Sequence, residues 1–223
     1  MQPAAPLRFL ALGDSYTVGE GIFLEESWPY LLAQRLTSSG FPCSPPEVIA
    51  KTGWSSDELL AGIEAANPQG PYDIVTIMIG VNNQYRGWSP EAMCKDVRAT
   101  LWKAIDLVGE RQNRIFVISI PDWGMSPFGQ TKNPDEITPN ILLFSEMIAI
   151  EARRRRTNWI DITDFSELAR YFAEFNAADH LHPSGAMHHL WMERIAPVIL
   201  KQLQPATEAP NAEATEATTS EET

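Results

Sequence analysis

Short apolar runs that alternate with longer helical patterns constrain the fold of this chain more than any other feature. Three runs stand out: LRFLAL over residues 7–12, DIVTIMI over 73–79 and RIFVISI over 114–120. Each has the length of a strand and is mostly apolar, as expected of a strand that is buried on both faces. Strands of this kind form parallel sheets that helices cover on both sides. The pattern therefore predicts an α/β protein.

Weaker signals complete the alternation of strands and helices. Further strands are expected at 47–50 and 159–162, and helices at 27–36, 55–66, 89–109, 138–156 and 184–203. Ser55 with Glu58 has the spacing of a capping box, and Ser89-Pro90 and Thr138-Pro139 are typical helix starts. Pro197 is expected to bend or interrupt the last helix. We predict a three-layer α/β/α sandwich with a five-stranded parallel sheet in flavodoxin-like order.

Length and charge limit the domain organisation and the class of partner. The 223 residues, of which 44% are hydrophobic, are enough to bury a large core in one domain. That domain is expected over residues 1–204, followed by a disordered acidic tail over 205–223 that contains five glutamates and no lysine or arginine. The formal net charge of -12 opposes binding to nucleic acid or anionic lipid. Because no secretory signal or membrane span is recognisable, a cytoplasmic location is expected, unless an export signal has been trimmed.

Polar residues and glycines follow the predicted strands. Gly13-Asp14-Ser15 comes after the first strand, Gly53 after the second and Gly80-Val81-Asn82 after the third, while Asp179 and His182 lie late in the chain. Open parallel sheets bind ligands at the carboxyl ends of their strands. We therefore expect these residues to converge at one edge of the sheet.

These residue types suit acyl transfer by a serine nucleophile. The Ser15 hydroxyl needs a base to take its proton, and His182 can be that base. Asp179, about one turn of chain earlier, can hold the imidazole tautomer and stabilise the imidazolium. The backbone N–H groups of Ser15 and Gly53 and the side chain of Asn82 can bind the oxyanion. Each residue also has a structural interpretation, because Asp179 can cap a helix and Gly53 and Asn82 can serve in turns.

Taken in order, these segments resemble the sequence blocks of the SGNH (GDSL-type) hydrolase family over about residues 7–203. The resemblance implies a flavodoxin-like α/β/α fold, Ser15 as nucleophile, and hydrolysis of esters, thioesters or carbohydrate esters without a metal. Two positions depart from the family's pattern. Tyr16 follows Ser15 where a leucine is common, and Asn83 stands where the family usually has aspartate. The effect of Asn83 on the following loop is not specified by the sequence.

Large aromatic residues near the predicted edge are candidate substrate contacts. Trp54, Trp88 and Trp123 each follow a predicted strand, where they can line an acyl pocket, stack on a sugar ring or pack loops onto the sheet. Asp14, beside the proposed nucleophile, is also expected to bind substrate. Trp102 and Trp191 fall on predicted helices and are expected in the core.

The histidines invite a metal-site interpretation. All four lie from His180 to His189, with Asp179 beside them, and histidine with carboxylate is ordinary zinc chemistry. However, His182 alternates with His180 along the chain, and His188 is adjacent to His189 on a predicted helix. Few of these side chains can face one point, so no metal or other cofactor is expected.

Two clusters of charged residues have simpler structural interpretations. Asp161, Asp164 and Glu167 suit a glycosidase, but nothing places two of them in one cleft, and Asp164 suits a helix N-cap. The four arginines at 153–156 are expected at a helix C-terminus, where cations face the helix dipole.

The sequence therefore predicts a serine esterase that hydrolyses carboxylic esters, either short-chain acyl esters or acetylated carbohydrates. Its expected partner is a small-molecule ester. The alternative is a non-catalytic carbohydrate-binding module on the same scaffold, although such a module has no need of an aspartate-supported histidine beside a serine. The acyl group, the alcohol, the physiological substrate, the oligomeric state and the role of the acidic tail are not specified by the sequence.

Overall fold

A five-stranded parallel sheet forms the middle of the protein, whose structure is a computed structural model that describes residues 5–204. The strands are β1 (Phe9–Gly13), β2 (Glu47–Ala50), β3 (Ile74–Met78), β4 (Ile115–Ile118) and β5 (Asn158–Ile160). They lie in the order β2-β1-β3-β4-β5, which is the predicted flavodoxin-like order. The tail predicted to be disordered, 205–223, lies outside the described residues.

The three central strands are buried from end to end. Every residue of β1, β3 and β4 is buried, whereas the edge strands β2 and β5 are partly exposed. Leu10 of β1 lies beside Glu47 of β2 on one side and Val75 of β3 on the other. The apolar runs thus occupy the centre of the sheet, where helices exclude water from both faces.

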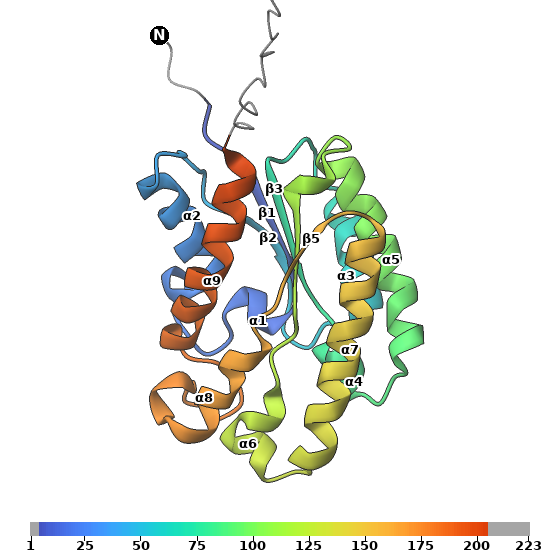
Figure 1. Cartoon of the computed structure of the whole chain (residues 1–223), viewed down its shortest axis with the longest axis vertical. Helices are drawn as coiled ribbons and strands as arrows, with labels where there is room; N and C mark the ends of the chain where they lie inside the picture. The colour runs from blue at the N-terminus through green and yellow to red at the C-terminus, as the bar shows by residue number, and fades with distance from the viewer. Residues whose placement is uncertain (1–4, 205–223) are drawn as a thin grey trace, which may run out of the picture.

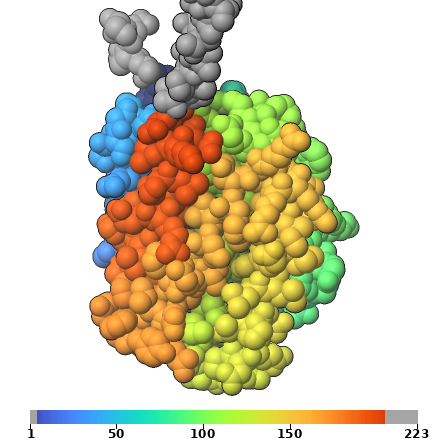
Figure 2. All heavy atoms as spheres, viewed as in Figure 1, coloured from blue at the N-terminus to red at the C-terminus, as the bar shows by residue number. Residues whose placement is uncertain are grey.

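Two layers of helices cover the sheet. Helices α2 (Trp28–Ser38) and α9 (Gly185–Leu203) lie on one face, and α3 (Ser56–Ala66), α5 (Pro90–Leu107) and α7 (Pro134–Arg154) lie on the other (Figure 1). In the space-filling view from the same side, side chains of α7 and α9 cover much of the surface (Figure 2). The predicted α/β/α sandwich is confirmed.

Short elements gather at the carboxyl end of the sheet. Helix α1 (Ser15–Val18) follows β1, α4 (Val81–Tyr85) follows β3, and α6 (Pro127–Gln130) and α8 (Ser166–Tyr171) lie at the same end of the molecule (Figure 1). The 3₁₀ segments of the described chain are Leu24–Glu26, Gln112–Arg114, Trp123–Met125, Thr163–Phe165 and Ala173–Phe175. Among residues 5–204, no helix has both the length and the apolar character needed to cross a bilayer.

Capping explains where two of the predicted helices begin. Ser55 is the N-cap of α3, and its N–H donates to the Glu58 carboxylate at 2.9 Å. At the start of α5, Ser89 Oγ accepts the N–H of Ala92 at 3.2 Å. These bonds satisfy N–H groups that have no partner within the helix, so both predicted starts are correct.

One predicted helix start is wrong, and the interruption that was one of two possibilities at Pro197 does not occur. Helix α7 begins at Pro134 instead of Thr138, because a proline at the first helical position has no N–H that needs a partner. Thr138 lies inside α7, where its hydroxyl donates to the Asp122 carboxylate at 2.5 Å. Helix α9 continues through Pro197, which lies on an exposed side of the helix.

Trp102 and the arginine run also differ from expectation. Trp102 is 59% exposed, and the guanidinium of Arg155 lies 5.3 Å from the centre of its ring. Arg154 and Arg155 bind the buried carboxylate of Glu151 at 2.9 and 2.7 Å, as does Arg98 of α5 at 3.4 Å. Neutralisation of this carboxylate therefore explains part of the run, which was attributed above to the helix dipole alone.

Candidate active site

Ser15 lies on a tight turn between β1 and α1. A Cβ atom at Gly13 would lie 2.1 Å from the Thr17 hydroxyl, so only glycine fits where the strand passes into the turn. Asp14 is the N-cap of α1 and accepts the N–H of Tyr16 at 3.0 Å. The cap starts the helix at Ser15 and leaves that residue at the carboxyl edge of the sheet.

Three side chains from distant parts of the chain form a continuous hydrogen-bonded series. Ser15 Oγ lies 3.1 Å from His182 Nε2, and His182 Nδ1 lies 2.6 Å from Asp179 Oδ2. Because a carboxylate only accepts hydrogen bonds, we infer that His182 Nδ1 carries the proton. The lone pair of Nε2 then faces the Ser15 hydroxyl.

A short turn holds Asp179 and His182 together. Asp179 Oδ1 accepts the N–H groups of Leu181 and His182, each at 2.9 Å. Desolvation raises the pKa of Asp179, but the hydrogen bonds from His182 and Leu181 outweigh it, and the pKa lies below its ordinary value. His180, in the middle of the turn, has a φ of 62°. The carboxylate is therefore committed to its own turn and does not cap α9, whose N-cap is Ser184.

Helix α4 ties the Gly53 loop to the site. Asn82 Nδ2 donates to the Trp54 carbonyl at 2.9 Å and lies 3.5 Å from Asp14 Oδ2. Arg86 Nη2 donates to the carbonyl of Gly53 at 2.6 Å. Gly53 itself has a φ of 85°, a conformation that favours glycine. The loop after β2 is thus held by two side chains from the helix after β3.

Asp14 has a structural place in the site and no route to substrate. Its side chain is 0% exposed, and burial raises its pKa to about 7 despite the hydrogen bond from the Tyr16 N–H. A fully buried carboxyl cannot contact a substrate, which corrects the expectation that Asp14 binds one. Its carboxyl instead shapes the turn that carries Ser15 and faces the Asn82 amide.

Asn83, which departs from the family's usual aspartate, is fully buried against the start of α3. Its Oδ1 accepts the N–H of Ser56 at 2.9 Å, and its Nδ2 donates to Ser56 Oγ at 2.9 Å. Ser56 Oγ in turn donates to Asp96 at 3.2 Å. A neutral amide thus makes the same helix-start contact that a carboxylate can make, without burying a second charge near Asp96.

Comparison with known proteins places these features in a family. The model of the GDSL-like lipase/acylhydrolase family matches residues 11–190, which is most of the chain. The chain belongs to this family. The predicted resemblance is therefore confirmed, and Ser15, Asn82 and His182 all lie within the matched residues.

Relatives of known structure share the fold at low sequence identity. A crystal structure of TesA is 21% identical, with a TM-score of 0.70 and coverage of 88% of this chain and 99% of that one. The psychrotrophic esterase EstA from Pseudoalteromonas sp. is 19% identical, with a TM-score of 0.66 and coverage of 88% and 98%. Axe2, an acetylxylan esterase from Geobacillus stearothermophilus, is 17% identical, with a TM-score of 0.64 and coverage of 91% and 96%.

One curated relative is closer in sequence but shorter in coverage. An arylesterase from Vibrio mimicus is 29% identical over 124 residues, which are 52% of this chain and 58% of that protein. The chain thus spans little more than half the length of this relative.

A pocket of about 180 Å³ opens beside Ser15. Its lining comes from four segments of the carboxyl edge and consists of Ser15, Tyr16, Val81, Asn82, Tyr85, Trp123, Leu181 and His182. The ring of Tyr85 lies edge-on to Trp123 at 5.2 Å, and Trp123 Nε1 donates to Gln84 at 2.7 Å. Sequence reasoning did not single out Tyr85, Val81 or Leu181. The available signal is that Val81 and Leu181 are direct neighbours of Asn82 and His182, and that Tyr85 lies three positions after Asn82.

The predicted tryptophans divide between the pocket and the scaffold. Trp123 lines the pocket, whereas Trp54 and Trp88 do not. A Cβ atom at Gly62 would lie 2.3 Å from the ring of Trp54, so this ring packs on α3. Trp88 is half-buried and its N–H donates to the Asn83 carbonyl at 2.9 Å. Packing of loops onto the scaffold, one of the alternatives stated for these residues, therefore applies to Trp54.

The remaining histidines and carboxylates are used elsewhere. His188 is buried, its Nδ1 accepts the Trp28 N–H at 3.1 Å, and desolvation, aided by the charge of His182, lowers its pKa to about 3. Residues 5–204 contain no group of three or more His, Cys, Asp or Glu side chains placed to hold a metal ion. Asp164 forms an ion pair with Arg194 and is not the N-cap that the sequence suggested.

Proposed function

We propose that the protein is a serine esterase in which Ser15 is the nucleophile, His182 the general base and Asp179 the residue that orients the base. The observation that carries the proposal is the series Ser15 Oγ, His182 and Asp179, with contacts of 3.1 and 2.6 Å, at the base of a pocket. Such a series activates a serine hydroxyl for attack on a carbonyl carbon.

The reaction proceeds through an acyl-enzyme. Ser15 Oγ bonds to the ester carbonyl carbon while His182 Nε2 takes the hydroxyl proton. The tetrahedral intermediate then collapses, the carbon–oxygen bond to the alcohol breaks, and His182 gives its proton to the departing alcohol oxygen. Water attacks the acyl-Ser15 ester with His182 again as base, which releases the carboxylic acid and restores Ser15. Asp179 stabilises the imidazolium in both halves of the reaction.

The proposed donors for the developing oxyanion are the N–H groups of Ser15 and Gly53 and the amide of Asn82, of which Ser15 and Asn82 line the pocket. One Asn82 N–H is held by the Trp54 carbonyl at 2.9 Å, while the distance to Asp14 is 3.5 Å, at the limit of a hydrogen bond. Asn82 lines the pocket, and we infer that the N–H not held by the Trp54 carbonyl serves the oxyanion there. Loss of one such donor typically lowers kcat by about 10²–10³.

The pocket suits a small ester. Its volume of about 180 Å³ and its wall of Val81, Tyr85, Trp123 and Leu181 favour a compact, largely apolar group. The arylesterase and the acetylxylan esterase among the relatives point the same way. We infer that the substrates are short-chain carboxylic esters, with acetylated carbohydrates as one class, and that no cofactor takes part.

The test compares wild type, Ser15→Ala and a control, Ser38→Ala, on an exposed position of α2. Each protein is incubated with a fluorophosphonate for intact-mass analysis, and turnover of p-nitrophenyl acetate is measured. We expect one adduct and turnover in wild type and in Ser38→Ala, and neither in Ser15→Ala.

Absence of both adduct and turnover in folded wild type would overturn the proposal that the protein is a serine esterase. It would favour the alternative stated from the sequence, a carbohydrate-binding module without catalysis. Circular dichroism of all three proteins establishes that they are folded.

A further inference from the structure

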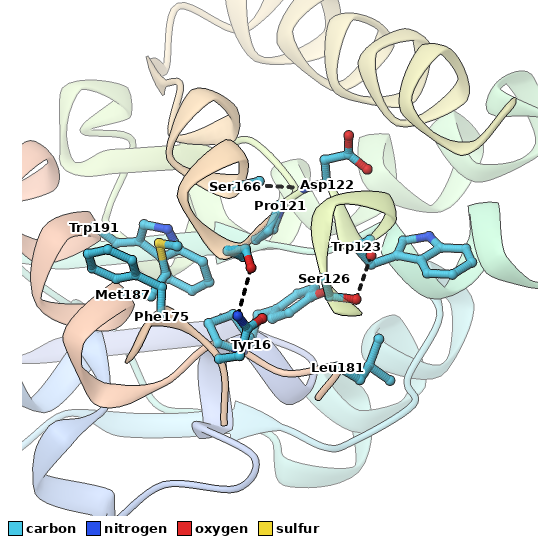
Figure 3. A pocket seen from close by; sticks show the side chains of 13 residues that line it. Tyr16, Pro121, Asp122, Trp123, Ser126, Ser166, Phe175, Leu181, Met187 and Trp191 are labelled. Carbon is cyan, nitrogen blue, oxygen red and sulfur yellow. Dashed lines mark hydrogen bonds between the residues drawn. The ribbon is translucent and has the colours of Figure 1, made fainter. Parts of the chain in front are cut away.

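A second, smaller cavity, of about 20 Å³, shares three wall residues with the pocket beside Ser15, and Figure 3 shows its lining. Side chains from α1, the loop after β4, α8, the segment before α9 and α9 itself surround it. They are Tyr16, Pro121, Asp122, Trp123, Ser126, Ser166, Ala169, Phe175, Asn176, Leu181, Pro183, Met187 and Trp191. Nothing in the reaction described above uses this cavity.

Tyr16 stands between the two spaces. It lines both of them, together with Trp123 and Leu181. Its ring is edge-on to His182 of the pocket at 6.0 Å and edge-on to Trp191 of the cavity, also at 6.0 Å. In Figure 3 the Tyr16 side chain lies between the group that includes Trp191 and the side where Trp123 and Leu181 lie. The tyrosine ring is therefore a partition, and only 4% of the residue is exposed.

Three polar side chains of the cavity wall are bonded to other wall residues. Ser126 Oγ donates to the Trp123 carbonyl at 2.7 Å, and Ser166 Oγ accepts the Asp122 N–H at 2.9 Å (Figure 3). Asn176 Nδ2 donates to the Ala169 carbonyl at 2.7 Å. The indole N–H of Trp191 has no partner among the described residues, whereas the rings and chains of Pro121, Phe175 and Met187 suit hydrocarbon.

We propose that Tyr16 is a specificity-determining residue whose ring closes the pocket against longer acyl chains and separates it from the cavity. The proposal rests on the proposed esterase function. It names the substrate class more narrowly, as esters whose acyl group ends before the tyrosine ring. The partition also gives a role to Tyr16, which stands where the family commonly has leucine.

The chemistry favours the acyl arm over the alcohol arm. The alcohol must leave the site after His182 protonates it, whereas the acyl group stays bonded to Ser15 until water attacks. A pocket closed at its back by Tyr16, Trp123 and Leu181 suits the arm that stays. One extra or missing methylene in an apolar pocket changes the ratio of kcat/KM values between two substrates by about 10–200-fold.

The first experiment measures kcat/KM for p-nitrophenyl acetate, butyrate and hexanoate with wild type, Tyr16→Leu and Tyr16→Phe. Leucine joins the cavity to the pocket, so we expect the hexanoate-to-acetate ratio to rise at least about 10-fold. Phenylalanine keeps the ring, so Tyr16→Phe is expected to keep the wild-type ratio.

The second experiment closes the cavity from its far side. Ala169 of α8 lines the cavity and not the pocket, so Ala169→Leu fills the same space without touching Ser15. Alone it is expected to keep the wild-type ratio, because the tyrosine ring already excludes substrate. In the Tyr16→Leu background it is expected to return the ratio toward wild type.

Suppose that Tyr16→Leu folds and still reacts with fluorophosphonate. An unchanged hexanoate-to-acetate ratio would then overturn the proposal for Tyr16, while the proposed esterase function would stand. The proposal would also be overturned if Tyr16→Leu gained kcat/KM on acetate esters of longer alcohols instead of on esters of longer acids. If Tyr16→Leu does not fold, Tyr16→Met also removes the ring and must give the same rise. If wild type neither reacts with fluorophosphonate nor hydrolyses any of these esters, the proposed function is overturned, and this inference with it.

Discussion

His188 occupies a fully buried position on α9, where its ring lies 4.7 Å from that of Trp191. Its Nδ1 accepts the N–H of Trp28 at 3.1 Å, at the first residue of α2. Protonation would cost the desolvation of a charge and would remove this hydrogen bond, because a protonated ring nitrogen cannot accept. A neutral imidazole thus joins the two helices that cover one face of the sheet.

Acid is therefore expected to destabilise the protein through His188. Burial lowers the pKa of His188 from 6.5 to about 3, so between these values the unfolded chain binds a proton that the folded chain does not. The free energy of unfolding then falls as pH falls through this window, by up to about 1.4 kcal/mol per pH unit for one proton. Urea unfolding across the window, with wild type and His188→Asn, measures the effect.

Asparagine supplies an acceptor without a titrating group, so His188→Asn is expected to show a shallower loss of stability on acidification. The exposed neighbour gives the matched control, and His189→Asn is expected to follow wild type. Equal pH slopes in wild type and His188→Asn would contradict the prediction. Asp14 has a displaced pKa in both proteins and cancels in the comparison.

At the scale of single elements, helix α4 carries more of the site than its length suggests. Asn82 and Arg86, one turn apart, hold the carbonyls of Trp54 and Gly53 at 2.9 and 2.6 Å. Arg86 also contacts Ser55 Oγ at 3.1 Å and forms an ion pair with Glu58 at 2.9 Å. The Arg86 guanidinium thus connects the end of α4 to the start of α3 and to the Gly53 loop that precedes α3.

Arg86→Ala is expected to lower kcat with little change in KM, because the Gly53 loop loses its anchor while the pocket wall stays. The loss should be smaller than the ~10²–10³ that follows removal of a donor itself. Affinity for a trifluoromethyl ketone, which forms an oxyanion on a serine, should fall with kcat/KM. Affinity for the product acid should not change, and Arg86→Lys should recover part of the loss.

A matched control separates this effect from the loss of any surface ion pair. Arg35 on α2 has a similarly exposed side chain, at 46% against 42% for Arg86, and also pairs with an exposed glutamate, Glu193. Arg35→Ala is expected to keep wild-type kcat. A fall in stability alone for Arg86→Ala, with unchanged kcat and ketone affinity, would refute the positioning role.

The elements differ in how well the sequence predicts them, and the reason is where their stabilising contacts come from. β1, β3 and β4 are predictable because burial on both faces demands continuous apolar runs. The start of α3 is predictable because Ser55 and Glu58 are local partners. The start of α7 is not, because Thr138 has its partner, Asp122, in another segment, and the sequence does not display that contact.

The same distinction applies to the site. The ends of β1 and β3 bring Ser15 and Asn82 to one pocket because parallel strands align their carboxyl ends, and the segment before α9 adds His182. Tyr85 and Leu181 were not predicted as wall residues, since the direction of a loop side chain depends on packing between elements. For the same reason Trp54 and Trp123, alike in the sequence, face different surroundings. The catalytic roles stay predictions until the labelling experiment is done.

At the scale of the whole molecule, negative charge is in large excess. The formal net charge is -12, and half of the ion pairs of the described chain join two exposed side chains. Exposed pairs contribute little, typically about 0–1 kcal/mol, whereas like charges on a compact surface repel one another. Repulsion between the excess negative charges is therefore expected to outweigh the attraction within the exposed ion pairs.

Salt is therefore expected to stabilise the folded protein. Raising sodium chloride from a low concentration to about 0.15 M screens repulsion beyond roughly 8 Å. A gain of about 1 kcal/mol would raise Tm by about 2–4 °C in a domain of this size. Thermal unfolding followed by circular dichroism gives the shift, and a Tm that falls with added salt would mean that attraction between charges dominates instead.

The turn from Asp179 to His182 has a mechanical consequence. The carboxylate grips two backbone N–H groups and the imidazole of the same short segment, so acid and base form one rigid piece. When that segment shifts, the spacing inside the piece persists and only the 3.1 Å gap to Ser15 changes. If Ser15 and His182 act as proposed, a displacement of this segment would change the activity through that one distance, while the contact between Asp179 and His182 is kept.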